Sequence, residues 1–399
     1  MSEGLLLRNA QVVLSDGSVK RAAVLIEGGR IARITEDGAE TDAGEIADLE
    51  GAFLLPGFID LHIHGAVGAD VTETDVDGLR KIARFLVREG VTSWLPTLVP
   101  APDEDYKRAA GAIEELMAWQ ETASGEGEPT ARALGLHYEG PFVNQAQCGA
   151  LRTEYFRVYK KAADLEPLTM IANPRARHMM TVAPEIEGGI ELVRELRRRG
   201  FIVSIGHTGA DIASLDQAFE AGARHMTHFM NAMAPLHHRA PGPIGWGLLR
   251  DDVTCDVIAD GIHVEPFMLR LVLKCKGIER ISLISDAVAP TGLGDGVYQV
   301  WGGRIAVLRG RTSNERGSIA GSVITLSDAV RLMLQLGVSI ADIARMAATN
   351  PARLLGVIEE CGTIEEGKRA DLVALDESGE VRLTIVGGRV AFNADDLEL

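Results

Sequence analysis

The chain has 399 residues, of which 46% are hydrophobic and 24% charged, a mixture typical of a folded globular protein and too apolar for a disordered one. Asp and Glu number 57 against 40 for Lys and Arg, so the net charge is −17 and the chain would repel a nucleic-acid backbone. Because domains average about 150 residues, the length allows two or three domains, or one large barrel with an appendage.

Both ends of the chain predict β-hairpins. Short apolar or alternating runs with glycine turns cover residues 5–14, 22–27, 30–35, 370–376, 382–386 and 389–391. Two of the turns, Glu27-Gly-Gly-Arg-Ile-Ala32 and Val386-Gly-Gly-Arg-Val-Ala391, are near copies. We therefore predict a small β-sandwich domain built from residues 1–55 and 356–399. A third copy, Trp301-Gly-Gly-Arg-Ile-Ala306, lies between them, so the repeat also fits hairpin chemistry alone.

The central region predicts a barrel. Eight β-rich runs occur in it, at residues 57–63, 91–95, 133–138, 178–183, 201–206, 223–228, 254–259 and 281–285. Amphipathic stretches lie between many of these runs, at residues 75–89, 103–122, 187–199, 211–221 and 264–276. Eight such units favour an α/β fold, a (β/α)8 TIM barrel over residues 56–355. The alternative, an open doubly wound sheet, needs a phosphate-binding glycine motif that is missing at the first turn.

Polar residues stand at the ends of the predicted barrel strands, where the active site of such a barrel gathers. They are His62 and His64 at the first strand, Glu139 at the third, His207 at the fifth, His228 at the sixth, His263 after the seventh and Asp286 at the eighth. Because side chains alternate along a strand, the first two histidines point to the same side. Imidazoles and a carboxylate that converge in this way are ligands for a divalent metal.

Zn²⁺ is the metal that this ligand set favours, as one or two ions, and Fe²⁺, Mn²⁺ and Co²⁺ are alternatives because affinity order alone does not select. A single histidine is more often a structural residue with one hydrogen bond. We keep that interpretation for four others, His137, His178, His225 and His237, and expect that His225 could also orient a ligand.

No apolar run reaches the roughly 18 residues that a membrane-spanning helix needs. The N-terminus lacks the basic start and long apolar core of a secretory signal. The four cysteines are scattered without a Cys-x-x-Cys pair, which is typical of a reducing compartment. We therefore expect a cytoplasmic protein with no membrane partner.

Several short motifs follow one another in a specific order. They are Pro56-Gly-Phe-Ile-Asp60 with His62 and His64, His137-Tyr-Glu139-Gly-Pro-Phe142, Thr181-Val-Ala-Pro-Glu185, Gly206-His207-Thr208, Thr227-His228-Phe-Met-Asn231-Ala-Met233, His238-Arg239 with Pro241-Gly242, Ile258-Ala-Asp-Gly-Ile-His263, Ser285-Asp286-Ala and Ala320-Gly-Ser322. Together they resemble the N-acetylglucosamine-6-phosphate deacetylase family of the amidohydrolase superfamily. The resemblance extends from about residue 5 to residue 390.

The resemblance implies a role for each matching residue. Glu139, His207 and His228 match the principal metal site of the family, and His62 with His64 match a second metal site that some members have. Asp286 matches the catalytic aspartate. The residues that match the substrate-binding positions are Asn231, Ala232, Arg239 and His263, with Arg239 as the cation for a phosphate. Homodimers are common among members, so a homodimer is expected.

The chain departs from the family pattern at Leu151, at Gln147-Cys148, where basic residues are common, and at Glu265, where a second histidine is frequent. Members usually have a histidine that polarises the substrate carbonyl where this chain has Leu151, after Gly149-Ala150. Two interpretations follow. In the first, a second metal at His62 and His64 replaces the missing histidine; in the second, the natural substrate is a different N-acyl compound.

The predicted function is metal-dependent deacetylation of an N-acetylated amino sugar phosphate, with N-acetylglucosamine 6-phosphate converted to glucosamine 6-phosphate and acetate. Asp286 would act as general base and then as general acid. One alternative is an amidohydrolase acting on a different N-acyl compound or a cyclic amide. Another is an inactive sugar-phosphate binding protein, because a fold alone does not prove activity.

Overall fold

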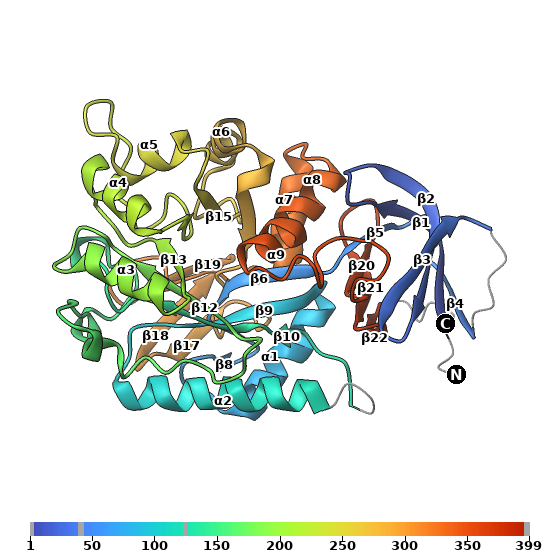
Figure 1. Ribbon diagram of the computed structural model, residues 1–399, viewed down its shortest axis with the longest axis horizontal. Coiled ribbons are helices and arrows are strands. Elements are labelled where there is room, and N and C mark those ends of the chain that lie inside the picture. The colour runs from blue at the N-terminus through green and yellow to red at the C-terminus, as the bar shows by residue number, and fades with distance from the viewer. Residues whose placement is uncertain (1–3, 39–43, 123–126, 395–399) are drawn as a thin grey trace.

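The computed structural model describes residues 4–38, 44–122 and 127–394, which form a barrel and a smaller β domain side by side (Figure 1). The barrel strands are β6 (Phe58–Ile63), β9 (Val91–Leu98), β11 (Gly135–Glu139), β12 (Arg177–Val182), β13 (Ile202–Ile205), β14 (His225–Met226), β15 (Thr254–Ile258) and β16 (Ile281–Ile284). Neighbouring strands pair in parallel. The Asp286 N–H donates to the His62 carbonyl at 2.9 Å and joins the last strand to the first. The predicted barrel is confirmed.

Helices cover the outside of the barrel. They are α1 (Val76–Arg88), α2 (Asp103–Thr122), α3 (Gly189–Arg198), α4 (Ile212–Ala221), α5 (Gly242–Leu249), α6 (Pro266–Lys276), α7 (Leu326–Gln335), α8 (Ile340–Ala344) and α9 (Asn350–Leu354). The five predicted stretches match α1, α2, α3, α4 and α6. The pattern did not reveal α5 because its residues from Pro243 to Leu248 are all buried, so it has no amphipathic stripe.

Two kinds of side chain fill the barrel. An apolar cluster contains Leu61, Leu95 and Met179 and is covered by Leu355. A polar set is held by buried hydrogen bonds: the Thr227 hydroxyl lies 2.7 Å from that of Thr181 and 2.5 Å from that of Ser204. His137 Nε2 lies 2.7 Å from the Thr181 hydroxyl in the same set. A satisfied buried network of this kind rigidifies the strands from which the polar strand ends project.

The smaller domain joins the two ends of the chain in one sheet. Its strands are β1 (Leu5–Val13), β2 (Val19–Glu27), β3 (Arg30–Glu36), β4 (Glu45–Asp48), β5 (Phe53–Pro56), β20 (Leu372–Leu375), β21 (Val381–Val386) and β22 (Arg389–Asn393). Strand β5 pairs with both β1 and β20, and Leu7, Val24 and Ile385 share one apolar core. The predicted small β domain built from both termini is confirmed, with its strands connected in one sheet.

The two near-copy turns of this domain touch each other. A Cβ on Gly388 would lie 2.7 Å from Gly29 Cα, closer than such atoms approach. Both glycines also have a left-handed φ, +78° at Gly29 and +77° at Gly388. The repeated glycine pair therefore serves a contact between hairpins from opposite ends of the chain, in addition to the turn itself.

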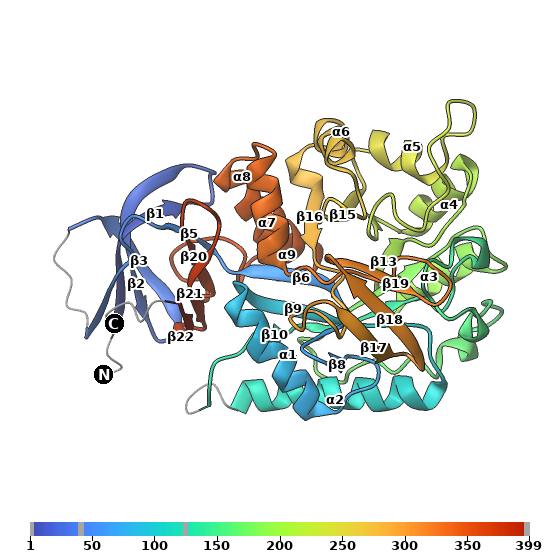
Figure 2. The ribbon, with the colours of Figure 1, turned by 180° about the vertical axis from the view of Figure 1, so that it is seen from behind.

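The third copy of the turn belongs to a different sheet. It connects β17 (Gly296–Val300) to β18 (Gly303–Leu308), which pairs with β19 (Arg311–Asn314), and this three-stranded sheet lies against the barrel (Figure 2). Smaller pieces are the hairpin of β7 (Gly65–Ala66) and β8 (Ala69–Asp70) and the edge strand β10 (Arg132–Ala133). The hairpin chemistry of this repeat is confirmed, but it lies outside the terminal sheet.

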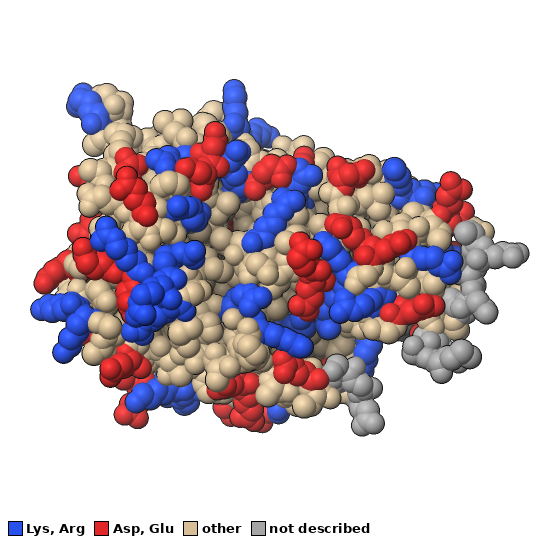
Figure 3. All heavy atoms as spheres, viewed as in Figure 1, with Lys and Arg blue, Asp and Glu red and all other residues tan. Residues whose placement is uncertain are grey.

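Among the described helices, none has the length and apolar character needed to cross a bilayer. Acidic and basic side chains are interspersed over the face of the molecule that Figure 3 shows. That face therefore has no continuous basic stripe of the kind that nucleic acids bind.

Candidate metal centre and substrate cavity

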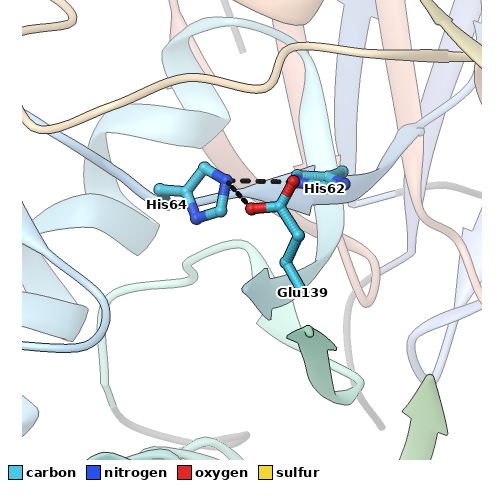
Figure 4. Close-up of side chains that lie close together, drawn as sticks. All are labelled: His62, His64 and Glu139. Atoms are coloured by element: carbon cyan, nitrogen blue, oxygen red, sulfur yellow. Dashed lines mark hydrogen bonds and ion pairs between the residues drawn. The ribbon is translucent and has the colours of Figure 1, made fainter. Parts of the chain in front are cut away.

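Strand β6 and strand β11 bring two histidines and a glutamate together. His62 lies within β6 and His64 follows it, and their Nε2 atoms are 3.0 Å apart. Glu139 is the last residue of β11; its Oε2 lies 3.3 Å from His64 Nε2 and its Oε1 lies 3.7 Å from His62 Nε2. Figure 4 shows the three side chains pointing toward one another from the two strands.

Two further histidines reach the same carboxylate from β13 and β14. His207 and His228 follow these strands by two residues each, and the Nε2 atom of each lies 2.9 Å from Glu139 Oε1. Their own Nε2 atoms are 3.1 Å apart. Glu139 is therefore shared by two groups of potential metal ligands, one with His62 and His64 and one with His207 and His228.

The histidine ring geometry fits a divalent cation. The Nδ1 atom of His207 lies 2.8 Å from the Gln147 carbonyl, and that of His64 lies 3.3 Å from the Thr97 carbonyl. A carbonyl accepts only from Nδ1–H, and that tautomer leaves the lone pair of Nε2 free to face the cluster. Buried nitrogen and carboxylate donors that converge in this way suit a borderline metal ion. The five residues therefore form a candidate site for a divalent metal.

The electrostatics of the cluster show how strongly its members interact. Burial alone lowers the pKa of His64, but hydrogen bonds to Asp286 and Glu139 outweigh it and raise the pKa to about 10. The same opposition raises the pKa of His228 to about 9, with Glu139 as its partner. The surrounding histidines hold the pKa of Glu139 well below its usual range, although burial opposes them. The carboxylate is therefore an anion fit to balance a bound cation.

Asp286 stands beside this cluster, two residues after the end of β16. Its Oδ1 atom lies 3.2 Å from His64 Nε2 and 3.4 Å from His62 Nε2. The side chain of Asp60 fixes the preceding residue, because Asp60 Oδ2 accepts a hydrogen bond from the Ser285 hydroxyl at 2.5 Å. Burial raises the pKa of Asp60 to about 7. Asp286 is thus held next to the site by a carboxylate on the neighbouring strand.

The backbone is strained where these residues are placed. Several non-glycine residues that line the cavity beside the cluster have a left-handed φ. They are His207 at +47°, His228 at +31°, Ala232 at +49°, Asp286 at +50° and Trp301 at +54°. Each such residue costs on the order of 1–3 kcal/mol and persists where the surrounding structure holds it. Strain of this kind concentrates at functional sites.

Two carboxylates that the sequence did not identify as site residues hold the metal-ligand candidates in place. Asp256 accepts a hydrogen bond from the His228 backbone N–H and lies 2.9 Å from His225 Nε2, so His225 contacts the residue that holds the backbone of His228. Glu185 accepts from the Thr208 hydroxyl at 2.6 Å and fixes the loop after His207. Glu185 was visible as the last residue of one of the quoted motifs, whereas Asp256 lay unnoticed inside a predicted strand.

A cavity of about 270 Å³ opens on the cluster. It is lined by His64, Glu139, His207, His228 and Asp286 together with Asn231, Ala232, His263, Gly149, Ala150, Leu151, Trp301, Ser318, Ile319 and Gly321. Three of the four predicted substrate-binding residues therefore reach the same space as the cluster and Asp286. Leu151 also lines it, at the position that the family comparison singled out.

Arg239 is the exception. It is not among the described residues that line this cavity, and it lies in the exposed segment 235–240 between β14 and α5. Its guanidinium contacts the neighbouring His238, with Nη1 at 2.7 Å from Nε2. Within one chain, Arg239 therefore stands apart from the other predicted substrate-binding residues.

Comparisons with known proteins show the family to which the chain belongs. A family model described as the amidohydrolase family matches residues 53–391. A protein of Bacillus subtilis named N-acetylglucosamine-6-phosphate deacetylase is 37% identical, over 98% of both chains. One of Escherichia coli O157:H7 named N-acetylgalactosamine-6-phosphate deacetylase is 35% identical, over 96% of this chain and 98% of the other. The crystal structure of N-acetylglucosamine-6-phosphate deacetylase from Pasteurella multocida superposes with a TM-score of 0.88, at 30% identity, over 98% of this chain and 100% of the other.

Proposed function

Because the chain belongs to the amidohydrolase family and, within it, to the N-acetylglucosamine-6-phosphate deacetylases, we propose that it hydrolyses the acetamide of an N-acetylated amino sugar phosphate. The substrate is N-acetylglucosamine 6-phosphate, and the products are glucosamine 6-phosphate and acetate. The observation that carries the proposal is the cavity in which Asp286, the histidine–glutamate cluster and the polar residues Asn231 and His263 meet.

The cluster holds a divalent metal, and we propose Zn²⁺ as the native ion. Glu139, His207 and His228 would form the principal site, and His62 with His64 would add a second site that shares Glu139. When bound, such a cation activates a water molecule and polarises the carbonyl of the amide. Leu151 offers no hydrogen-bond donor to that carbonyl, so the histidine pair on β6 supports the interpretation that the second site replaces the missing histidine.

The residues of the chain carry the proton. The Asp286 carboxylate accepts a proton from the attacking water and returns it to the amide nitrogen as the C–N bond breaks, which releases the amine and acetate. Its position beside His62 and His64, with Oδ1 within 3.4 Å of both Nε2 atoms, suits a group that must reach the water and the leaving nitrogen in turn. Asp60, through Ser285, keeps the backbone of Asp286 in register.

The remaining residues hold the sugar phosphate. The side-chain amide of Asn231 and the backbone N–H of Ala232 are donors suited to a phosphate, and His263 is a partner for a sugar hydroxyl. His263 is itself fixed, because its Nδ1 lies 2.6 Å from Asp260 Oδ2. The names of the relatives include both a glucosamine and a galactosamine enzyme, and the glucosamine name recurs in relatives from Bacillus subtilis, Lysinibacillus sphaericus and Homo sapiens, which supports the gluco sugar.

Exposed apolar side chains support a homodimer. Leu236 lies in the same exposed segment as Arg239 and is 46% exposed, while Leu249 at the end of α5 and Phe267 at the start of α6 are 83% and 72% exposed. In Figure 1 the chain between α4 and α5 extends outward beyond these helices. We propose that this face meets a second copy of the chain and that Arg239 serves the cavity of that copy.

The test is acetate release by the metal-loaded enzyme. We expect N-acetylglucosamine 6-phosphate to be hydrolysed with kcat/KM above about 10⁴ M⁻¹s⁻¹, the lower range for working enzymes. The matched substrates are N-acetylgalactosamine 6-phosphate, which differs at one carbon, and unphosphorylated N-acetylglucosamine. A value below about 10² M⁻¹s⁻¹ for both sugar phosphates would reject the proposed substrate.

A further inference from the structure

Two residues that line the cavity, Ala232 and Trp301, lie beside different histidines of the cluster. A Cβ placed on Gly149 would lie 3.6 Å from His207 Cε1 and 3.7 Å from Ala232 Cβ, so Ala232 lies on the His207 side. The Trp301 ring instead meets the His64 ring edge to face, with centroids 5.6 Å apart. Ala232 and the Trp301 ring therefore lie beside different histidines of the cluster, His207 and His64.

Leu151 and Trp301 form one apolar surface on the His64 side. Leu151 is only 4% exposed and forms a small apolar cluster with Val99 and Val143. The Trp301 side chain packs against this apolar cluster. Both residues also line the cavity. Apolar groups favour such a surface because contact removes their area from water.

The surface is held from behind by hydrogen bonds. The indole N–H of Trp301 donates to Asp70 Oδ2 at 2.8 Å, and Arg316 donates to the Leu151 carbonyl at 3.1 Å. The left-handed φ of Trp301, +54°, is unfavourable for a residue with a side chain and persists because these contacts fix the tip of the hairpin. Both apolar side chains are therefore presented to the cavity in fixed positions.

We propose that Leu151 and Trp301 receive the acyl group of the substrate and select N-acyl groups by size. The inference rests on the proposed deacetylase function: with the phosphate on the Asn231 and Ala232 side and the amide at the cluster, the acyl methyl points to the His64 side. Leucine at position 151 then acts as a wall for that methyl group. Behind it lie Val99 and Val143, which pack with Leu151 in the same apolar cluster.

The test compares acyl groups on one sugar. We would measure kcat/KM for glucosamine 6-phosphate carrying N-acetyl, N-propionyl or N-butyryl groups, with wild type and Leu151→Ala. Because one methylene in an apolar pocket is discriminated by about 10–200-fold, Leu151→Ala is expected to raise the butyryl-to-acetyl ratio by at least about tenfold. The ratio is taken on one protein sample, so a reduced folded fraction in the variant cancels.

Val143→Ala is the matched control, because Val143 belongs to the same apolar cluster but is not among the described residues that line the cavity. It should leave the ratio within about twofold of wild type. An unchanged ratio in Leu151→Ala, or an equal change in both variants, would overturn the inference. If wild type releases no acid from any of the three sugar phosphates, the deacetylase function fails instead, so the two failures are distinguishable.

Discussion

At the scale of single residues, Asp286 carries the most specific prediction. Asp286→Asn keeps the size of the side chain but removes the base, so kcat should fall by at least about 100-fold, the lower range for general acid–base catalysis. Metal content should stay at the wild-type level, because Asp286 is not a member of either candidate ligand group. The measurements are acetate release and metal analysis on the same sample.

The control for this substitution is Asp211→Asn. Asp211 caps α4 by accepting from the Ser214 N–H, and asparagine caps a helix equally well. This variant should therefore keep wild-type activity. Full activity in metal-loaded Asp286→Asn would remove Asp286 from the mechanism.

A second residue-scale prediction concerns His178, which lies at the start of β12 away from the cluster. Its Nε2 accepts from the Ile171 N–H at 3.0 Å, and burial lowers its pKa to about 4. The unfolded chain, with a pKa near 6.5, binds more protons between these two values. Stability therefore falls as the pH drops from about 6.5 to 4, by about 1–2 kcal/mol at pH 5.

The measurement is urea unfolding at pH 7.5 and pH 5.0 with a chelator present, so that metal release does not contribute. His178→Gln cannot take up the proton, and its amide oxygen can still accept from Ile171, so it should lose less stability between the two pH values than wild type. The exposed His237→Gln should behave like wild type. If His178→Gln has the same pH dependence as wild type, the neutral buried imidazole is not responsible.

At the scale of elements, the two histidines of strand β6 and its end bear on how many metal ions the site binds. The period of two along the strand places His62 and His64 on one face, which the alternation of side chains along a strand predicted and the 3.0 Å separation of their Nε2 atoms confirms. Their convergence with Glu139 depends on the pairing and curvature of distant strands, which no local pattern contains. The sequence could therefore name the members of the cluster but not their distances.

His62→Asn with His64→Asn tests whether β6 holds a metal. Wild type loaded with metal should bind two equivalents, and the double variant should bind one and lose activity, because asparagine lacks the imidazole nitrogen. The control is His237→Asn, a histidine outside the cluster, which should still bind two. Binding of a single equivalent by wild type, together with full activity of the double variant, would make the pair structural.

The third glycine turn shows how far an element can be predicted. Its sequence correctly indicated a hairpin, because turn chemistry is local. The sequence did not show that this turn reaches the cavity, because Trp301 is held there by contacts with Asp70 and His64. Both residues are more than 200 positions away in the chain. Similarly, α5 escaped prediction because burial on all sides removes the amphipathic signal.

At the scale of the whole molecule, the position of Arg239 predicts a site shared between copies. If Arg239 serves the cavity of a second copy, an Arg239→Ala chain and an Asp286→Asn chain should complement each other. In a mixed dimer, the chain with intact Asp286 receives Arg239 from its partner, so one of the two cavities is complete. Arg239→Ala alone should raise the KM for the sugar phosphate by about ten- to a hundredfold. Asp286→Asn alone should strongly reduce kcat.

The experiment unfolds and refolds the two variants together and measures kcat/KM at a low sugar-phosphate concentration. The kcat/KM of the refolded mixture should exceed the average kcat/KM of the two variants refolded separately. The oligomeric state is measured in parallel. Mixtures that equal that average, in a confirmed dimer, would show that Arg239 acts on its own chain or not at all.

The sequence by itself determined the barrel, the hairpins of both ends, the family and the identities of the residues at the strand ends. These follow from alternation, turn chemistry and motif order, which are properties of neighbouring residues. Tertiary structure alone decided that four histidines share the carboxylate of Glu139, that Arg239 is not among the residues that line the cavity of its own chain and that Leu151 meets Trp301. The physical reason is that these are contacts between residues far apart in the chain, set by barrel closure and by loop paths.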